Sequence, residues 1–126
     1  MITNETIQEI ARAWIRYNTS HDKEDEWVLD PVGEWISQGQ LDATWRLVLA
    51  LCSEVHGDDL TMIGNIGAGP VEEFIVKFGD AALDLIEPSV AANPILLRAL
   101  AMVWGWEVPE RTRVDRILEE HNQQRL

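Results

Sequence analysis

Residues 63–73 read IGNIGAGPVEE, with three glycines and one proline directly ahead of two glutamates. Two interpretations compete for this stretch: a loop that binds phosphate, and a joint between two helices. A phosphate loop of the G-x-x-x-x-G-K-[ST] type needs a lysine and a hydroxyl after its last glycine, and this stretch offers neither. A G-x-G-x-x-G loop would place its last glycine where this chain has Glu72. Glu72 and Glu73 would also repel a phosphate, so the sequence favours the joint.

The joint gives each small residue a conformational role. Residues 60–66 are predicted to form a short helix that Gly67 ends in the left-handed conformation. Gly69 then allows a sharp turn, and Pro70 begins the next helix, where its missing N–H is not needed. Glycine at positions 64 and 67 would also let a neighbouring helix approach closely.

Upstream of the joint, apolar residues recur three and four positions apart, as on one face of a helix. This spacing predicts a helix over residues 4–19 and a longer, central helix over residues 41–57. His56 and Gly57 are expected to end the central helix. Cys52 lies on its apolar stripe, which predicts a buried thiol in a reducing compartment.

Between these two helices the chain is polar and acidic. Residues 21–27, HDKEDEW, are expected to form a loop. Asp30 followed by Pro31 is typical of a helix cap followed by the first helical residue. A short helix should therefore run from this pair to Gly39.

Downstream of the joint, the apolar spacing over residues 71–78 predicts a helix that Gly79 ends. Asp80 is expected to cap the next helix, which Pro88 kinks or breaks. Asn93 with a following proline predicts another capped helix, apolar on almost every side and therefore buried.

The last helix is predicted to open at Pro109. Its inward-facing residues are expected to be Val114, Ile117, Leu118 and His121. Short connections between helices favour packing between sequence neighbours. The sequence thus predicts an all-α fold: a compact single-domain bundle over residues 1–126, with about seven or eight short helices packed as antiparallel helical hairpins.

Charge restricts the classes of partner. The chain carries 22 acidic and 10 basic residues, a formal net charge of −12. Such a surface repels nucleic acid and anionic lipid, so neither is an expected partner, whereas a basic protein is its electrostatic complement. The alternative is that the charge serves solubility alone. The N-terminus lacks the pattern of a secretory signal, and no apolar run is long enough to span a bilayer, so a cytoplasmic location is expected.

No residue pattern predicts a catalytic, cofactor or metal site. His56 with Asp58 and Asp59 offers too few ligands for a metal, and the solvated end of a helix explains these residues. The acids of the 21–27 segment lack the order of ligands in a calcium-binding EF-hand loop. The single cysteine also has no activating base nearby in the sequence.

Tryptophans offer a further clue to binding. Trp27 lies between acids, and Trp104 and Trp106 flank a glycine near the end of the buried helix. Aromatic residues ringed by charge are typical interface anchors. The competing interpretation is that these indoles cover the core from loops.

Four runs of the sequence resemble a known family: IARAWIRY, ATWRLVLAL, IGAGPVEEFIVKFG and NPILLRALAMVWG. Together they are similar to a family of small all-helical bacterial proteins of unknown function that carries an IGAGP-(L/V)-E-(D/E) core. The resemblance covers most of residues 7–106 and implies an all-helical fold, without an activity or a catalytic residue. The chain departs from the family pattern at Pro88 and in its acidic HDKEDE segment.

The leading hypothesis is a small acidic protein-binding module, of the kind that an immunity protein or antitoxin represents, which neutralises a basic toxin. One alternative is a structural or adaptor domain that self-associates through its tryptophans, as a homo-oligomer. Another is an uncharacterised enzyme or small-molecule binder with a cleft between helices. The residues expected to meet a basic partner are Asp22, Glu24, Asp25, Glu26, Trp27, Asp30, Glu34, Asp58, Asp59, Glu72 and Glu73.

Overall fold

A computed structural model describes residues 2–103 and 110–123 of the chain. Throughout these residues the regular structure is helical, without a strand, which confirms the all-α prediction. The α-helices are α1 (Asn4–Ser20), α2 (Leu29–Ser37), α3 (Leu41–Glu54), α4 (Leu60–Ile66), α5 (Glu72–Phe78), α6 (Asp80–Ile86), α7 (Pro94–Ala101) and α8 (Arg111–Glu120). Shorter helical segments connect some of them: the 3-10 helices η1 (Lys23–Val28) and η3 (Val90–Ala92), and the π-helix η2 (Gly67–Val71).

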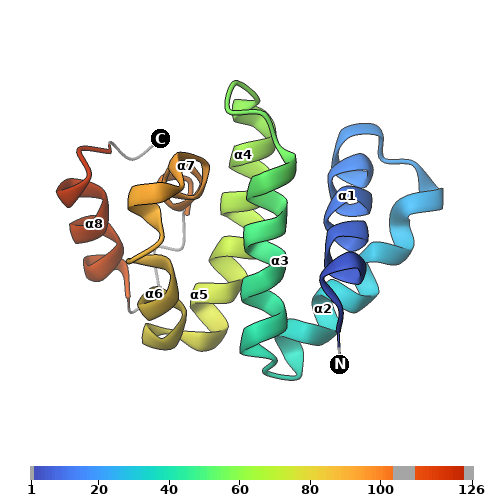
Figure 1. Cartoon of the computed structure of the whole chain (residues 1–126), viewed down its shortest axis with the longest axis horizontal. Coiled ribbons are helices and arrows are strands. Elements are labelled where there is room, and N and C mark those ends of the chain that lie inside the picture. The colour runs from blue at the N-terminus through green and yellow to red at the C-terminus, as the bar shows by residue number, and fades with distance from the viewer. Residues whose placement is uncertain (1, 104–109, 124–126) are drawn as a thin grey trace.

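The helices pack side by side around α3, as Figure 1 shows. α1 lies against one side of α3, and α4 returns antiparallel to α3 on the other side. α6, α7 and α8 lie beyond α4 and α5. One apolar cluster runs through the described helices, and Trp14 and Trp35 are both buried in it. Trp45 covers it from α3 by stacking on Phe74, with ring centroids 5.9 Å apart.

The acidic segment before α2 is helical, so the loop predicted over residues 21–27 is wrong. Asp22 accepts a hydrogen bond from the Glu24 amide and caps η1. η1 then continues directly into α2, because Val28 already has right-handed helical angles. Asp30 therefore lies inside α2 and is not its cap, and Pro31 occupies the first turn, where its missing N–H is no loss.

α3 is shorter than predicted because its last helical residue is Glu54. Val55 turns to an extended conformation and is itself buried. His56 and Gly57 then lie in the turn to α4, which begins after Asp59. The two residues predicted to stop α3 thus lie in the turn between the helices, two and three residues beyond the actual end of α3.

The predicted joint at residues 67–70 is also wrong. Gly67 has φ −65° and ψ −50°, which is right-handed helical, and the chain continues from α4 through η2 into α5 without a turn. Pro70 lies inside the π-helix. A proline lacks the N–H of a regular helical bond and clashes with the carbonyl four residues earlier, and the wider π turn accommodates both defects.

Close packing explains Gly64 and Gly67 of this continuous helix, in agreement with the second role predicted for these two positions. A Cβ atom on Gly67 would lie 2.9 Å from the Met102 Cβ and against the backbone of Ala99. A Cβ atom on Gly64 would lie 2.8 Å from the Met102 Cε. α7 therefore packs almost directly onto the backbone of α4 and η2.

Most of the downstream boundaries agree with the sequence. Gly79 ends α5 with φ +59°, and α6 ends before Pro88. Asn93 caps α7 by accepting a hydrogen bond from the Leu96 amide. Asp80 is the exception, because it is the first residue of α6, makes no capping bond, and instead pairs with α8.

In α8 the expected apolar residues Val114, Ile117 and Leu118 are buried. His121 does not share this burial, because it lies just after the helix as its C-cap and is partly exposed. The predicted opening residue, Pro109, lies outside the described residues.

Candidate functional site

The acidic residues of η1 and α2 form the largest part of the predicted partner surface. Glu24 and Glu26 on η1 are exposed, and so are Asp30 and Glu34 on α2. Trp27 lies among them with 45% of its surface exposed, so this indole is a surface residue and does not cover the core. The structure therefore brings five of the predicted residues onto one continuous helical segment.

Three other predicted acids hold the scaffold together. Asp22 caps η1, and Asp59 caps α4 by accepting a hydrogen bond from the Met62 amide. Asp25 forms an ion pair with Arg16 of α1 at 3.1 Å, and its side chain is only 16% exposed. This pair fastens η1 to α1, so Asp25 is poorly placed to meet a partner.

Glu72 and Glu73 open α5, which packs against α2. A groove of about 350 Å³ lies between the two helices, lined by Ile36, Glu72, Glu73, Val76 and Lys77. Partial burial, reinforced by the negative charge of Glu72, raises the pKa of the Glu73 carboxyl above its ordinary value. The groove therefore holds negative charge beside exposed apolar atoms.

Asp58 and Asp59 do not join this surface. Both lie in the turn between α3 and α4, at the end of α3 opposite α2 (Figure 1). The predicted set is thus split between an η1–α2–α5 side and a separate turn. Trp104 and Trp106 lie outside the described residues.

Sequence reasoning missed the exposed aliphatic residues of this side. Leu29 on α2 is 43% exposed and Val76 on α5 is 62% exposed. A signal for Val76 was present, because the apolar spacing over residues 71–78 places Phe74 and Ile75 inside and leaves Val76 off the stripe. Leu29 lies beside the expected cap, and no local pattern marks it as exposed.

Basic side chains are mostly engaged within the chain. Arg12 pairs with Glu54, Arg46 with Asp42, and Arg98 donates to the carbonyl of Gly57. Beyond these, a cluster joins α6 to α8 through Arg113 and Arg116, which contact Asp80, Asp84 and Glu87. Acids outnumber bases, and none of the ion pairs found among the described residues involves the exposed acids Glu24, Glu26, Asp30 and Glu34.

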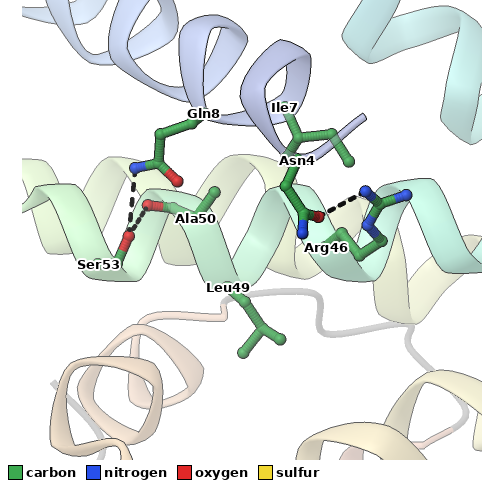
Figure 2. A pocket seen from close by; sticks show the side chains of 7 residues that line it. All are labelled: Asn4, Ile7, Gln8, Arg46, Leu49, Ala50 and Ser53. Atoms are coloured by element: carbon green, nitrogen blue, oxygen red, sulfur yellow. Dashed lines mark hydrogen bonds between the residues drawn. The ribbon is translucent and has the colours of Figure 1, made fainter. Parts of the chain in front are cut away.

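A second pocket, of about 290 Å³, lies between α1 and α3 (Figure 2). Arg46 donates to the Oδ1 atom of Asn4 across it, and Gln8 reaches Ser53 at its other end. Its remaining lining is aliphatic, from Ile7, Leu49 and Ala50. The Ser53 hydroxyl accepts from Gln8 and donates to the carbonyl of Ala50, and among the described residues no histidine or carboxylate lines the pocket to activate it.

The described residues contain no group of three or more His, Cys, Asp and Glu side chains that could hold a metal ion. His21 and His121 lie at the ends of α1 and α8, and His56 lies in the turn between α3 and α4. Cys52 is buried, as predicted, and burial raises the pKa of its thiol to about 12. The thiolate, which is the nucleophile, is therefore scarce at neutral pH.

Among residues 2–103 and 110–123, no helix combines the length and the apolar character needed to cross a bilayer.

One curated protein shares a segment with this chain: the heme-binding subunit MsrQ of the protein-methionine-sulfoxide reductase of Rhodospirillum rubrum, 40% identical over 50 residues. Those residues are 40% of this chain and 22% of that protein, so the chain matches less than a quarter of the relative's length. No solved structure matches the chain significantly. A family of unknown function, DUF6869, matches residues 16–123, which include the whole η1–α2–α5 side. The chain therefore belongs to the family of unknown function DUF6869.

Proposed function

We propose that this chain is a small acidic protein-binding module that recognises a basic protein, as an immunity protein or antitoxin recognises a basic toxin. The observation that carries the proposal is Trp27, a half-exposed indole set among the carboxylates of η1 and α2. Tryptophan is enriched among the residues that dominate binding energy, and a polar rim around such an anchor is the usual anatomy of an interface.

Electrostatics favours a basic partner over a second copy of the chain. Each copy carries a formal net charge of −12, so two copies that met through η1 and α2 would bring like charges together. A basic partner would instead be attracted by the whole acidic surface, and this attraction raises the association rate. Added salt screens the charges and lowers the rate again. Self-association of the chain through this surface is therefore less favourable than binding of a basic protein.

Within this proposal, the glycines and the proline of the IGAGPVEE run have a structural role, whereas its two glutamates belong to the partner surface. These glycines and the proline belong to the helix that α7 packs against. The need for this close packing would account for the IGAGP core of the bacterial family that the sequence resembles. Glu72 and Glu73 at its end would belong to the partner surface, because they lie beside α2.

The test is a comparison of proteins retained from a native lysate by three forms of the chain. Wild type is compared with the triple variant Glu26→Gln, Trp27→Ser, Asp30→Asn, and with the control Asp58→Asn in the α3–α4 turn. We expect wild type and the control to retain the same basic protein at about 0.05 M salt and to release it at about 0.5 M. The triple variant should retain little of it. Retention of no basic protein by wild type, or equal retention by all three forms, would reject the proposal.

A further inference from the structure

An apolar stripe crosses the solvent side of α2. Leu29, Gly33 and Ile36 are spaced i, i+4 and i+7, so they share one face of the helix over roughly 10 Å. Leu29 is exposed, and a Cβ atom on Gly33 would meet no atom within 4 Å. The stripe is therefore open to solvent at Leu29 and at Gly33, which forms a low point in its middle, and it ends at Ile36, which is partly buried against the core.

The stripe leads into the groove between α2 and α5. Ile36 is the last residue of the stripe and also lines the groove, together with the exposed Val76. Leu29, Ile36 and Val76 thus give an elongated apolar floor, made from two helices that are distant in sequence.

Both rims of this floor are acidic. Asp30 and Glu34 stand on α2 beside the stripe, and Glu72 and Glu73 stand on α5 beside Val76. Lys77 is the one base that lines the groove. An apolar floor between two acidic rims is the complement of a segment with an apolar face between two basic flanks.

We propose that the α2–α5 groove binds an amphipathic basic helix of the partner protein. The apolar face of that helix lies on Leu29, Gly33 and Val76, and its lysines or arginines reach the carboxylates of both rims. The inference rests on the proposed function and adds to it the place of contact and the secondary structure of the bound segment.

A helical segment fits better than an extended one. An extended peptide usually gains its affinity by pairing its backbone with a sheet edge, and the described residues offer no strand. A helix satisfies its own backbone hydrogen bonds and presents side chains every three or four residues, a spacing that matches the stripe on α2.

The probe for the test is a synthetic amphipathic helix of about 18 residues with leucines on one face and lysines on the others, because that length exceeds the stripe. A scrambled peptide of the same composition keeps the charge and loses the apolar face. Binding of each peptide is measured by fluorescence anisotropy at about 0.1 M salt. We expect the amphipathic peptide to bind at least about tenfold more tightly than the scrambled one.

The decisive variant is Gly33→Gln, which fills the low point of the stripe without changing the charge. Gly33 has negative φ and open space around it, so a long side chain fits the fold and interferes only with the occupant. Thr61→Gln, at an exposed position of α4, is the matched control. Gly33→Gln should weaken binding of the amphipathic peptide about tenfold, and Thr61→Gln should leave it unchanged. Circular dichroism checks the fold, and Val76→Ser replaces Gly33→Gln if the latter does not fold.

The outcomes separate this inference from the proposed function. If both peptides bind equally and Gly33→Gln has no effect, the attraction is merely electrostatic and the groove is not the site. The groove is likewise rejected as the site if neither peptide binds while wild type still retains a basic protein from lysate. If no basic protein is retained at all, the proposed function fails, and the inference fails with it.

Discussion

Gly67 lies so close to Met102 of the segment after α7 that a Cβ atom on the glycine would be 2.9 Å from the methionine Cβ. The same atom would press on the backbone of Ala99, which cannot rotate away as a side chain can. Contact at this point therefore depends on the absence of a side chain. It fixes the distance between α7 and the continuous helix from α4 to α5.

Replacing Gly67 with alanine should lower the free energy of unfolding by about 1–3 kcal/mol, because α7 must move to relieve the overlap. The matched control is Gly33→Ala, at a glycine with open space around it. That variant should gain about 0.5–1 kcal/mol from the better helix propensity of alanine. Urea denaturation followed by tryptophan fluorescence measures both. Equal effects of the two substitutions would show that Gly67 is not packed as described.

The comparison of Gly67 with Gly79 shows why the sequence predicted some boundaries and not others. Both glycines were expected to end helices, and of the two only Gly79 does so, with a positive φ. A glycine in a sequence can allow a positive φ, as at Gly79, or leave room for a neighbouring segment, as at Gly67. The local pattern does not distinguish the two roles, because the residue that Gly67 makes room for, Met102, is distant in the sequence. Pro70 raised the same ambiguity, since a π turn within a helix has no local signature that differs from a helix start.

The sequence predicted which acidic residues are exposed on η1 and α2, but it did not predict which residues lie beside them. The acids of η1 and α2 were found from charge alone, because exposed carboxylates are conspicuous in a sequence. Their meeting with Glu72 and Glu73 depends on the packing of α2 against α5, which no local pattern encodes. Asp25 and Asp59 were assigned to the partner surface because the sequence does not show their internal partners. In the structure Asp25 pairs with Arg16, and Asp59 accepts a hydrogen bond from the Met62 amide.

The contact between α6 and α8 offers a prediction about charge. Arg113 is 23% exposed and forms ion pairs with Asp84 at 2.8 Å, Asp80 at 3.0 Å and Glu87 at 3.3 Å. Hydrogen bonds to Asp84 and then Asp80 raise the pKa of its guanidinium group. Arg113→Gln should lower the free energy of unfolding by about 1 kcal/mol at low salt, and by less at about 0.5 M salt, because solvent screens these partners.

The control for Arg113 is Arg12→Gln, which removes a single exposed ion pair with Glu54. Its effect should stay below about 0.5 kcal/mol. Urea denaturation at the two salt concentrations measures both variants, and amide exchange in α8 should speed up in Arg113→Gln alone. If the two arginine variants are equally stable, the cluster does not hold α8 in place.

Cys52 leads to a prediction about alkaline pH. Burial raises the pKa of its thiol from 9.0 to about 12. Between these values the unfolded chain loses the thiol proton and the folded chain keeps it, so the free energy of unfolding falls as pH rises. The slope approaches about 1.4 kcal/mol per pH unit for this one group.

The matched variant for this prediction is Cys52→Ala, which lacks the titrating thiol. At about pH 8 wild type should be more stable than the variant, because the alanine leaves a small cavity. The difference in the free energy of unfolding between wild type and the variant should be smaller at about pH 10.5, because ionisation of the thiol in the unfolded chain destabilises only wild type. Urea denaturation at both pH values measures this difference, and a constant difference would mean that Cys52 ionises as readily in the folded chain as in the unfolded one.

The groove between α2 and α5 gives a prediction at the acidic end of the pH range. Partial burial, and then the charge of Glu72, raise the pKa of Glu73 in the folded chain. Below the ordinary glutamate pKa both states are protonated and the group has no effect on stability. As pH rises through the folded pKa, the folded chain must ionise a partly buried carboxyl beside another charge, so wild type loses stability.

Glu73→Gln should therefore increase the free energy of unfolding at about pH 7 and have no effect near pH 3. Glu34→Gln on α2 changes the net charge by the same amount and measures the general benefit of removing one acid from a chain with net charge −12. The gain in Glu73→Gln should exceed that in Glu34→Gln at neutral pH, as measured by thermal unfolding at both pH values. If the two variants respond identically, Glu73 experiences only the overall field of the protein and not the groove, and the carboxyl is then as available to solvent as one on the open face of α2.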